Sequence, residues 1–145
     1  MVEIQTPVLN EAVYEKVRGF HDYNWYLSLP IPAGSTIRVD LVVPKDEIYL
    51  ETGYEFEPDK LTLSDGTPVF VMSHWHDSRP QFLNLYLTES ILSFRYTKPE
   101  IVEETFTIVI TNRDTSDRTI TVLGLYRSIP KAIYLQKKEL AKMGV

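Results

Sequence analysis

The sequence predicts an all-β protein: an antiparallel β-sandwich, jelly-roll-like, with an extended N-terminal arm and a short C-terminal α-helix. Apolar and polar residues alternate with a period of two along most of the chain, the pattern of half-buried strands. Turn-forming residues separate these segments at regular intervals, with no helical segments between them, which favours a sandwich over an α/β fold. A chain of 145 residues is long enough to bury one core and suits a single domain.

Three segments follow from this pattern: an arm over residues 1–20, a sandwich over residues 21–127 and a basic helix over residues 128–145. The arm begins with apolar residues among few charges, on a segment too short to form a core of its own. We therefore expect it to order only against a partner, through Val2, Ile4, Val8 and Leu9.

The strands of the sandwich are expected where the alternation is clearest, around residues 25–29, 36–43, 48–56, 69–72, 83–87, 92–96, 105–111 and 120–125. In the last of these, the apolar positions change from the Ile120 and Val122 phase to the Leu123 and Leu125 phase. This shift around Gly124 predicts a β-bulge.

The C-terminal segment changes to helical spacing. Ser128 is the expected N-cap and Gly144 the expected end of the helix. Its apolar stripe is expected to pack on the sandwich or on a neighbouring subunit, through Ile129, Ile133, Leu140 and Met143.

Charge is distributed unevenly. The net charge is −5, but residues 128–145 hold four lysines and one glutamate, which leaves −8 on the other 127 residues. An acidic body repels a phosphate backbone, so we expect no nucleic-acid binding. No apolar run approaches the length of a membrane span, and no signal peptide is visible, so we expect a soluble protein that needs no membrane partner.

Catalytic motifs are missing from the sequence. Cysteine is absent, which excludes disulfides, thiolate zinc sites and cysteine nucleophiles. The six glycines stand singly, without a nucleophile elbow or a phosphate-binding loop. Glu55 and Glu57 share a strand face at a spacing that a glycosidase pair can use, but both lie in an acidic stretch that indicates a solvated edge. We therefore expect no enzymatic activity and no cofactor.

Two histidines are the candidate metal ligands. His74 and His76 share one face of a strand, as a pair of ligands would. A site needs a third ligand, for which His21 and Asp22 are the candidates. The alternative interpretation is a polar strand end next to the breaker at residues 78–80. We favour this alternative, and predict that neither histidine binds a metal.

Aromatic residues offer a possible binding surface. Tyr23, Tyr26 and Trp75 are candidates to stack on a sugar or to lie at a protein interface. Packing in the core is the other interpretation, and it suits Trp25 best because that residue is in phase with Leu27 and Leu29.

Residues 32–39 (Pro-Ala-Gly-Ser-Thr-Ile-Arg-Val) and 105–112 (Thr-Phe-Thr-Ile-Val-Ile-Thr-Asn), between an arm and a terminal helix, give the chain an architecture that resembles the decoration (auxiliary capsid) proteins of tailed bacteriophages. The resemblance implies a virion structural protein on the capsid exterior, a homo-oligomer with a trimer favoured, that contacts the major capsid protein. Four Asn and three Gln suit a thermostable protein of a heat-tolerant host.

Two other functions stay open. One is a carbohydrate- or receptor-binding β-sandwich that uses the three aromatic residues named above. The other is a small metal-dependent enzyme of cupin-like shape that uses the two histidines.

Overall fold

The computed structural model describes the backbone of residues 2–5 and 22–144, and the side chains of residues 26–144. The strands in these ranges are β1 (Val2–Gln5), β2 (Asp22–Ile31), β3 (Thr36–Val42), β4 (Glu47–Pro58), β5 (Phe70–His76), β6 (Arg79–Tyr86), β7 (Ser93–Val102), β8 (Thr105–Asn112) and β9 (Arg118–Pro130). A short 3₁₀ helix, η1 (Glu89–Ile91), precedes β7, and the α-helix α1 (Lys131–Lys142) follows β9.

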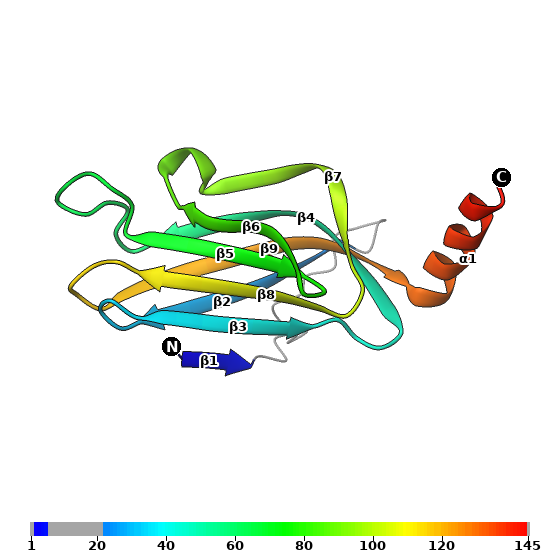
Figure 1. Cartoon of the computed structure of the whole chain (residues 1–145), viewed down its shortest axis with the longest axis horizontal. Helices are drawn as coiled ribbons and strands as arrows, with labels where there is room; N and C mark the ends of the chain where they lie inside the picture. Colours follow the sequence, from blue (N-terminus) through cyan, green and yellow to red (C-terminus); the bar gives the residue numbers. More distant parts are fainter. Residues whose placement is uncertain (1, 6–21, 145) are drawn as a thin grey trace.

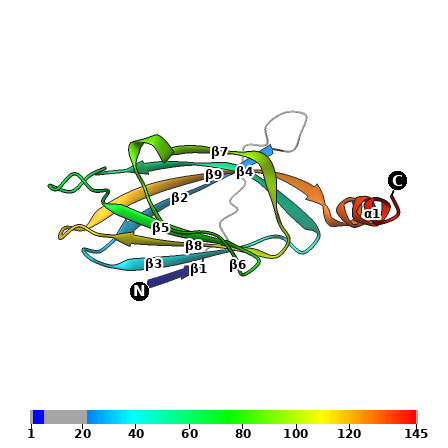
Figure 2. The ribbon, with the colours of Figure 1, turned by 45° about the horizontal axis from the view of Figure 1, so that its top comes forward.

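The strands form two facing sheets (Figures 1 and 2). One sheet has the order β1-β3-β8-β5-β6 and the other the order β2-β9-β4-β7. From β2 to β9, successive strands lie in opposite sheets, except for β5 and β6, which are neighbours in one sheet. This is the eight-stranded arrangement of a double-sheet jelly roll. The predicted fold class, an antiparallel β-sandwich of jelly-roll form with a short C-terminal helix, is confirmed.

The core lies between the two sheets and follows the alternation seen in the sequence. In β3 the buried residues are Ile37, Val39 and Leu41, and β8 contributes Phe106 and Ile108 from directly opposite pairs. These two strands therefore turn an apolar face inward and a more polar face outward. This places any inward-facing polar residue in an apolar surrounding.

The N-terminal segment begins with a short strand. Residues Val2–Gln5 form β1, which pairs in parallel with Ile37–Asp40 at the edge of the five-stranded sheet. These residues are thus extended, as expected of the arm, and the expectation that the arm orders only against a partner stays a prediction. The side chains of Val2 and Ile4, and all of Val8 and Leu9, lie outside the described residues.

The bulge that the sequence predicts at Gly124 is not in β9. That strand keeps one register with β2 through Gly124, and its even-numbered residues from Ile120 to Ser128 are buried without a change of phase. The irregularity lies in the neighbouring strand β4, between Glu51 and Gly53. Leu123 and Leu125 therefore sit on the outer face of the sheet.

The helix is present, but it begins later than expected. Strand β9 continues to Pro130, so Ser128 is a strand residue whose hydroxyl donates to Glu47 Oε1 at 2.6 Å, and not an N-cap. Helix α1 starts at Lys131, whose backbone N–H donates to Asp46 O at 2.8 Å. It extends away from one end of the sandwich (Figures 1 and 2), and none of its residues is buried.

Candidate functional site

A cluster of polar side chains lies inside the apolar core. His74 and His76 share the inward face of β5, and Glu51 reaches them from β4 in the opposite sheet. Their exposed fractions are 0%, 1% and 3%. His74 and His76 lie at the end of β5, as the sequence interpretation expected, but both rings are enclosed between the sheets.

The bulge in β4 brings two functional side chains of that strand to the same face. Before it, Tyr49 and Glu51 point inward; after it, Tyr54 and Phe56 do so. Without the extra residue, strict alternation would turn Tyr54 outward. The bulge therefore allows Glu51 and Tyr54 to approach His74 together.

A tight turn fixes the end of β5. Asp77 and Ser78 have φ of 49° and 66°, the positive values that a two-residue type I′ hairpin requires. The Asp77 carboxylate accepts hydrogen bonds from three backbone N–H groups of the β7–β8 connection, at 2.7 to 3.0 Å, from Glu103, Glu104 and Thr105. This clamp holds the residue next to His76 against a second loop.

The polar atoms of the cluster converge on one point. His74 Nε2 lies 2.8 Å from His76 Nε2 and 3.2 Å from Glu51 Oε2. His76 Nε2 also contacts Glu51 Oε2, and the Tyr54 hydroxyl contacts His74 Nε2. One carboxylate, two imidazoles and one phenol thus meet in a space closed to bulk solvent.

The protonation states follow from this environment. Burial lowers the pKa of His74 to about 4, although its hydrogen bond to the Thr107 carbonyl opposes the shift. His74 is therefore neutral at physiological pH. Burial raises the pKa of Glu51 to about 7, against the opposing hydrogen bond and charge of His76. Among the described residues, the basic side chains within 4.0 Å of the Glu51 carboxylate are these same two histidines.

The third member of the cluster is not one of the residues that the sequence analysis named. His21 lies outside the described residues, and so does the side chain of Asp22. Glu51 went unrecognised because it belongs to an acidic stretch that reads as a solvated edge. The sequence does contain a usable signal. Glu51 is two residues after Tyr49 and so shares its strand face, and after Thr52–Gly53 the apolar residues occupy the other set of alternating positions.

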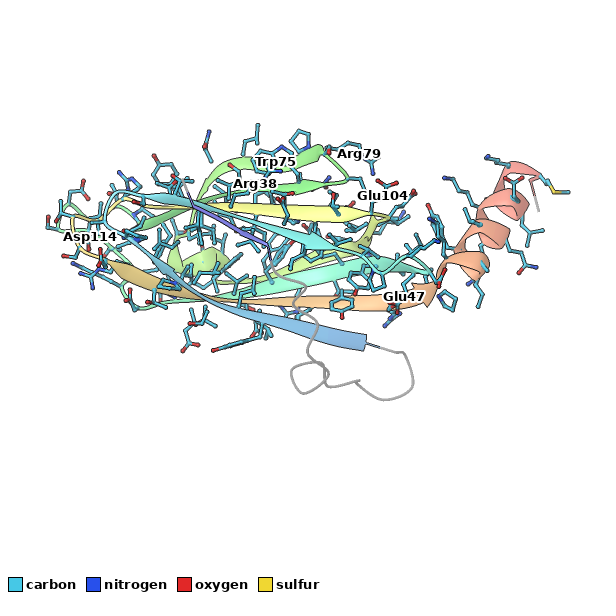
Figure 3. The ribbon with its side chains drawn as sticks, turned by 90° about the horizontal axis from the view of Figure 1, so that it is seen from below. Arg38, Glu47, Trp75, Arg79, Glu104 and Asp114 are labelled. Atoms are coloured by element: carbon cyan, nitrogen blue, oxygen red, sulfur yellow. The ribbon has the colours of Figure 1, made fainter. Side chains whose placement is uncertain are left out.

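The aromatic candidates do not form one platform. Tyr26 is 47% exposed on the outer face of β2, whereas Trp75 is half-buried on the outer face of β5, in the other sheet. Trp75 lines a shallow hollow of about 240 Å³ with Arg38 and Thr107, and Figure 3 shows Trp75 and Arg38 on the same side of the sandwich. The side chain of Tyr23 lies outside the described residues.

Tyr26 instead lines a hollow of about 370 Å³ with Glu55 and Glu57. The two carboxylates share the outer face of β4, as predicted, and both are exposed. Glu55 forms an ion pair with Arg95 at 2.9 Å. This surface combines one aromatic ring with two acids, and it is separate from the buried cluster.

The predicted interface residues of the C-terminal segment lie on two elements. Ile129 belongs to β9 and is half-buried. Ile133 and Leu140 are on α1 and Met143 is the residue that caps its C-terminus, and these three are 46%, 42% and 70% exposed. Spacings of seven and three residues put these three on one helix face. Tyr134 and Lys138 lie on the opposite face, where both contact Glu103 of the sandwich. The exposed apolar face therefore points away from the body of the protein.

The fold and the buried cluster define a jelly-roll β-sandwich with a carboxylate–imidazole centre. Comparison with family models and with curated proteins gives no match. Among solved structures, the chain is similar to PliG of Aeromonas hydrophila, a periplasmic inhibitor of g-type lysozyme. The identity is 8% over 86% of this chain and 96% of that one, with a TM-score of 0.39, too distant to carry an argument about function. No helix in the described ranges is long and apolar enough to cross a membrane.

Proposed function

We propose that this chain is a virion structural protein that decorates the exterior of a capsid as a closed homo-oligomer, with a trimer favoured. The observation that supports this most is the projecting helix α1. It has no buried residue, and it presents Ile133, Leu140 and Met143 away from its own sandwich. An exposed apolar helix face on a small domain is typical of an interaction surface.

Charge favours a second copy of the chain as the partner of this face. Residues 128–145 carry a net charge of +3, and the remaining chain carries −8. A helix from one subunit is therefore attracted to the acidic body of the next, and in a closed ring every helix has a partner. The acidic body also suits a position on the outside of a shell, away from the packaged genome. Contact with the major capsid protein completes the proposal.

Exchange of one apolar residue for a charge tests this interface. In the Ile133→Glu variant we expect the oligomer to dissociate at least tenfold more readily, because a buried unpaired carboxylate costs more than about 1.4 kcal/mol. Light scattering over a range of protein concentrations measures the change. Leu135→Glu is the matched control: Leu135 is 47% exposed but lies on another helix face. The proposal is contradicted if the wild-type chain is a monomer in solution and also fails to bind shells assembled from the major capsid protein.

A second candidate function is carbohydrate binding at the hollow lined by Tyr26, Glu55 and Glu57. It is favoured by the exposed Tyr26 ring beside two carboxylates that can accept hydrogen bonds from sugar hydroxyls. In a glycan array followed by titration calorimetry, we expect Tyr26→Ala to weaken binding of any sugar by tenfold or more. Tyr86→Ala, which removes a similarly exposed ring from the other sheet, is expected to have no effect. Absence of sugar binding by the wild-type chain excludes this function.

A further inference from the structure

We propose that Glu51, His74 and His76 bind one zinc-class divalent metal ion that links the two sheets of the sandwich. The proposal rests on the meeting of these three side chains in the core and is independent of the proposed assembly. It also reverses our expectation from the sequence that neither histidine is a ligand.

The polar atoms of the cluster lie close enough together to serve as ligands of one metal ion. The two Nε2 atoms are 2.8 Å apart, and His74 Nε2 is 3.2 Å from Glu51 Oε2. Ligand atoms about 2.0–2.1 Å from a tetrahedral zinc ion lie about 3.3 Å from one another. The ligand atoms of Glu51, His74 and His76 all lie within 4.8 Å of one another, so one ion can bind all three.

Hydrogen bonding by His74 cannot serve all the groups that meet at its Nε2 atom. Its Nε2 atom faces His76 Nε2, Glu51 Oε2 and the Tyr54 hydroxyl at once. A ring nitrogen has either one proton or one lone pair, so it serves one such partner well. A shared cation satisfies the imidazoles and the carboxylate together.

The orientation of His74 is that of a ligand. Its Nδ1–H donates to the Thr107 carbonyl at 3.0 Å, and a carbonyl can only accept. The proton therefore sits on Nδ1, and the Nε2 lone pair points into the cluster. Metal-binding histidines are fixed in this way by a hydrogen bond from the other ring nitrogen.

Two further atoms in the core lack partners. Glu51 Oε1 and the Tyr96 hydroxyl are buried and have no hydrogen bond within the described part of the chain. Glu51 has 3% of its surface exposed, and the Tyr96 ring lies 6.5 Å from that of His76. Buried polar groups of this kind are rare in folded proteins and indicate an ion or a water molecule. The second carboxylate oxygen can complete the coordination of the ion or hold a bound water.

The donor set and its enclosure select the type of metal. Two imidazole nitrogens and one carboxylate oxygen suit zinc, whereas calcium and magnesium favour oxygen ligands. The same donors bind iron in oxygenases, where open coordination positions face a substrate. Here the Tyr54 hydroxyl occupies the side next to His74, and neither hollow described above is lined by the cluster. A structural zinc site follows.

Metal analysis of the untagged full-length protein tests the proposal. We expect about one zinc per chain by mass spectrometry of the metals, and visible absorption bands after exchange for cobalt. Removal of the ion with a chelator should lower the midpoint of thermal unfolding by about 5 to 10 °C, and zinc should restore it. Iron in place of zinc overturns the structural zinc assignment.

Variants separate the site from general packing. Glu51→Gln and His76→Gln should lose the metal and the response to zinc. Met72→Leu, a change of similar volume on the same face of β5 at 0% exposure, should keep both. If the variants do not fold, the metal content and zinc response of the wild-type chain still test the proposal. Wild-type protein that contains no stoichiometric metal, takes up neither zinc nor cobalt, and melts at the same temperature with and without zinc overturns the proposal.

Discussion

Gly53→Ala is expected to destabilise the protein by about 3 kcal/mol or more, and to lower the midpoint of thermal unfolding by about 6 to 12 °C. A Cβ atom at residue 53 would lie 2.2 Å from the backbone oxygen of Phe94 and 2.8 Å from Cδ of Arg95. A backbone oxygen inside a sheet cannot move aside as the end of a side chain can. Strands β4 and β7 must therefore separate at the bulge, next to the fully buried Tyr54.

Amide hydrogen exchange shows whether the damage is where the bulge predicts it. In Gly53→Ala we expect faster exchange along the β4–β7 pair, because that pair has to open. Gly34→Ala is the control: its Cβ meets nothing within 4 Å, although φ is +65°. That change should cost about 1–2 kcal/mol and affect only the β2–β3 turn. Equal stability of Gly53→Ala and the wild type would show that the strands do not approach this closely.

Alternation identified the strands because the sandwich has one core and each strand turns one face toward it. Ile37, Val39 and Leu41, with Phe106 and Ile108 opposite, are the alternating apolar residues of the predicted strands 36–43 and 105–111, and all are buried. These residues follow a rule that depends only on the geometry of a single strand. The rule needs no information about which strands are neighbours.

The candidate site depends on which strands are neighbours, and no short stretch of the sequence shows this. Glu51 and His74 are on strands of different sheets, and only the jelly-roll topology places them face to face. The sequence analysis assigned the bulge to Gly124 because the leucines on either side of it are out of phase with Ile120 and Val122. Leu123 and Leu125 instead cover the outer face, and a phase shift caused by exposed apolar residues looks the same in the sequence as one caused by a bulge.

The start of the helix was misplaced for a related reason. A serine such as Ser128 is a good N-cap, but it also suits a strand end where its hydroxyl can donate a hydrogen bond. Here Glu47 on the neighbouring strand accepts that hydrogen bond. Ile129 pairs with Ile48 as part of the same ladder. Pairing of β9 with β4 adds backbone hydrogen bonds, and this outweighs the preference of Ser128 for an N-cap position.

Removal of residues 131–145 is expected to abolish assembly and leave the sandwich folded. The helix contributes no buried residue, and its side chains contact the body through surface interactions with Glu103, the Tyr134 hydrogen bond at 3.1 Å and the Lys138 ion pair at 4.0 Å. Exposed pairs of this kind contribute about 0–1 kcal/mol. The thermal midpoint should therefore fall by no more than about 4 °C, with the β-sheet circular dichroism unchanged, while light scattering reports a monomer.

A cut three residues earlier, after Arg127, provides the contrast. It also removes Ser128, Ile129 and Pro130, which pair with β4, and it leaves Glu47 without the hydroxyl that donates to it. Loss of this part-buried hydrogen bond costs about 0.5–1.5 kcal/mol, and the paired end of β9 is lost with it. This shorter chain should therefore melt clearly below the one that ends at Pro130. Both truncations lack the helix, and only the second damages the sandwich. If the chain that ends at Pro130 is as unstable as the shorter one, the helix packs on its own sandwich. If the chain that ends at Pro130 stays oligomeric, the interface lies elsewhere. Either result removes α1 from the proposed assembly.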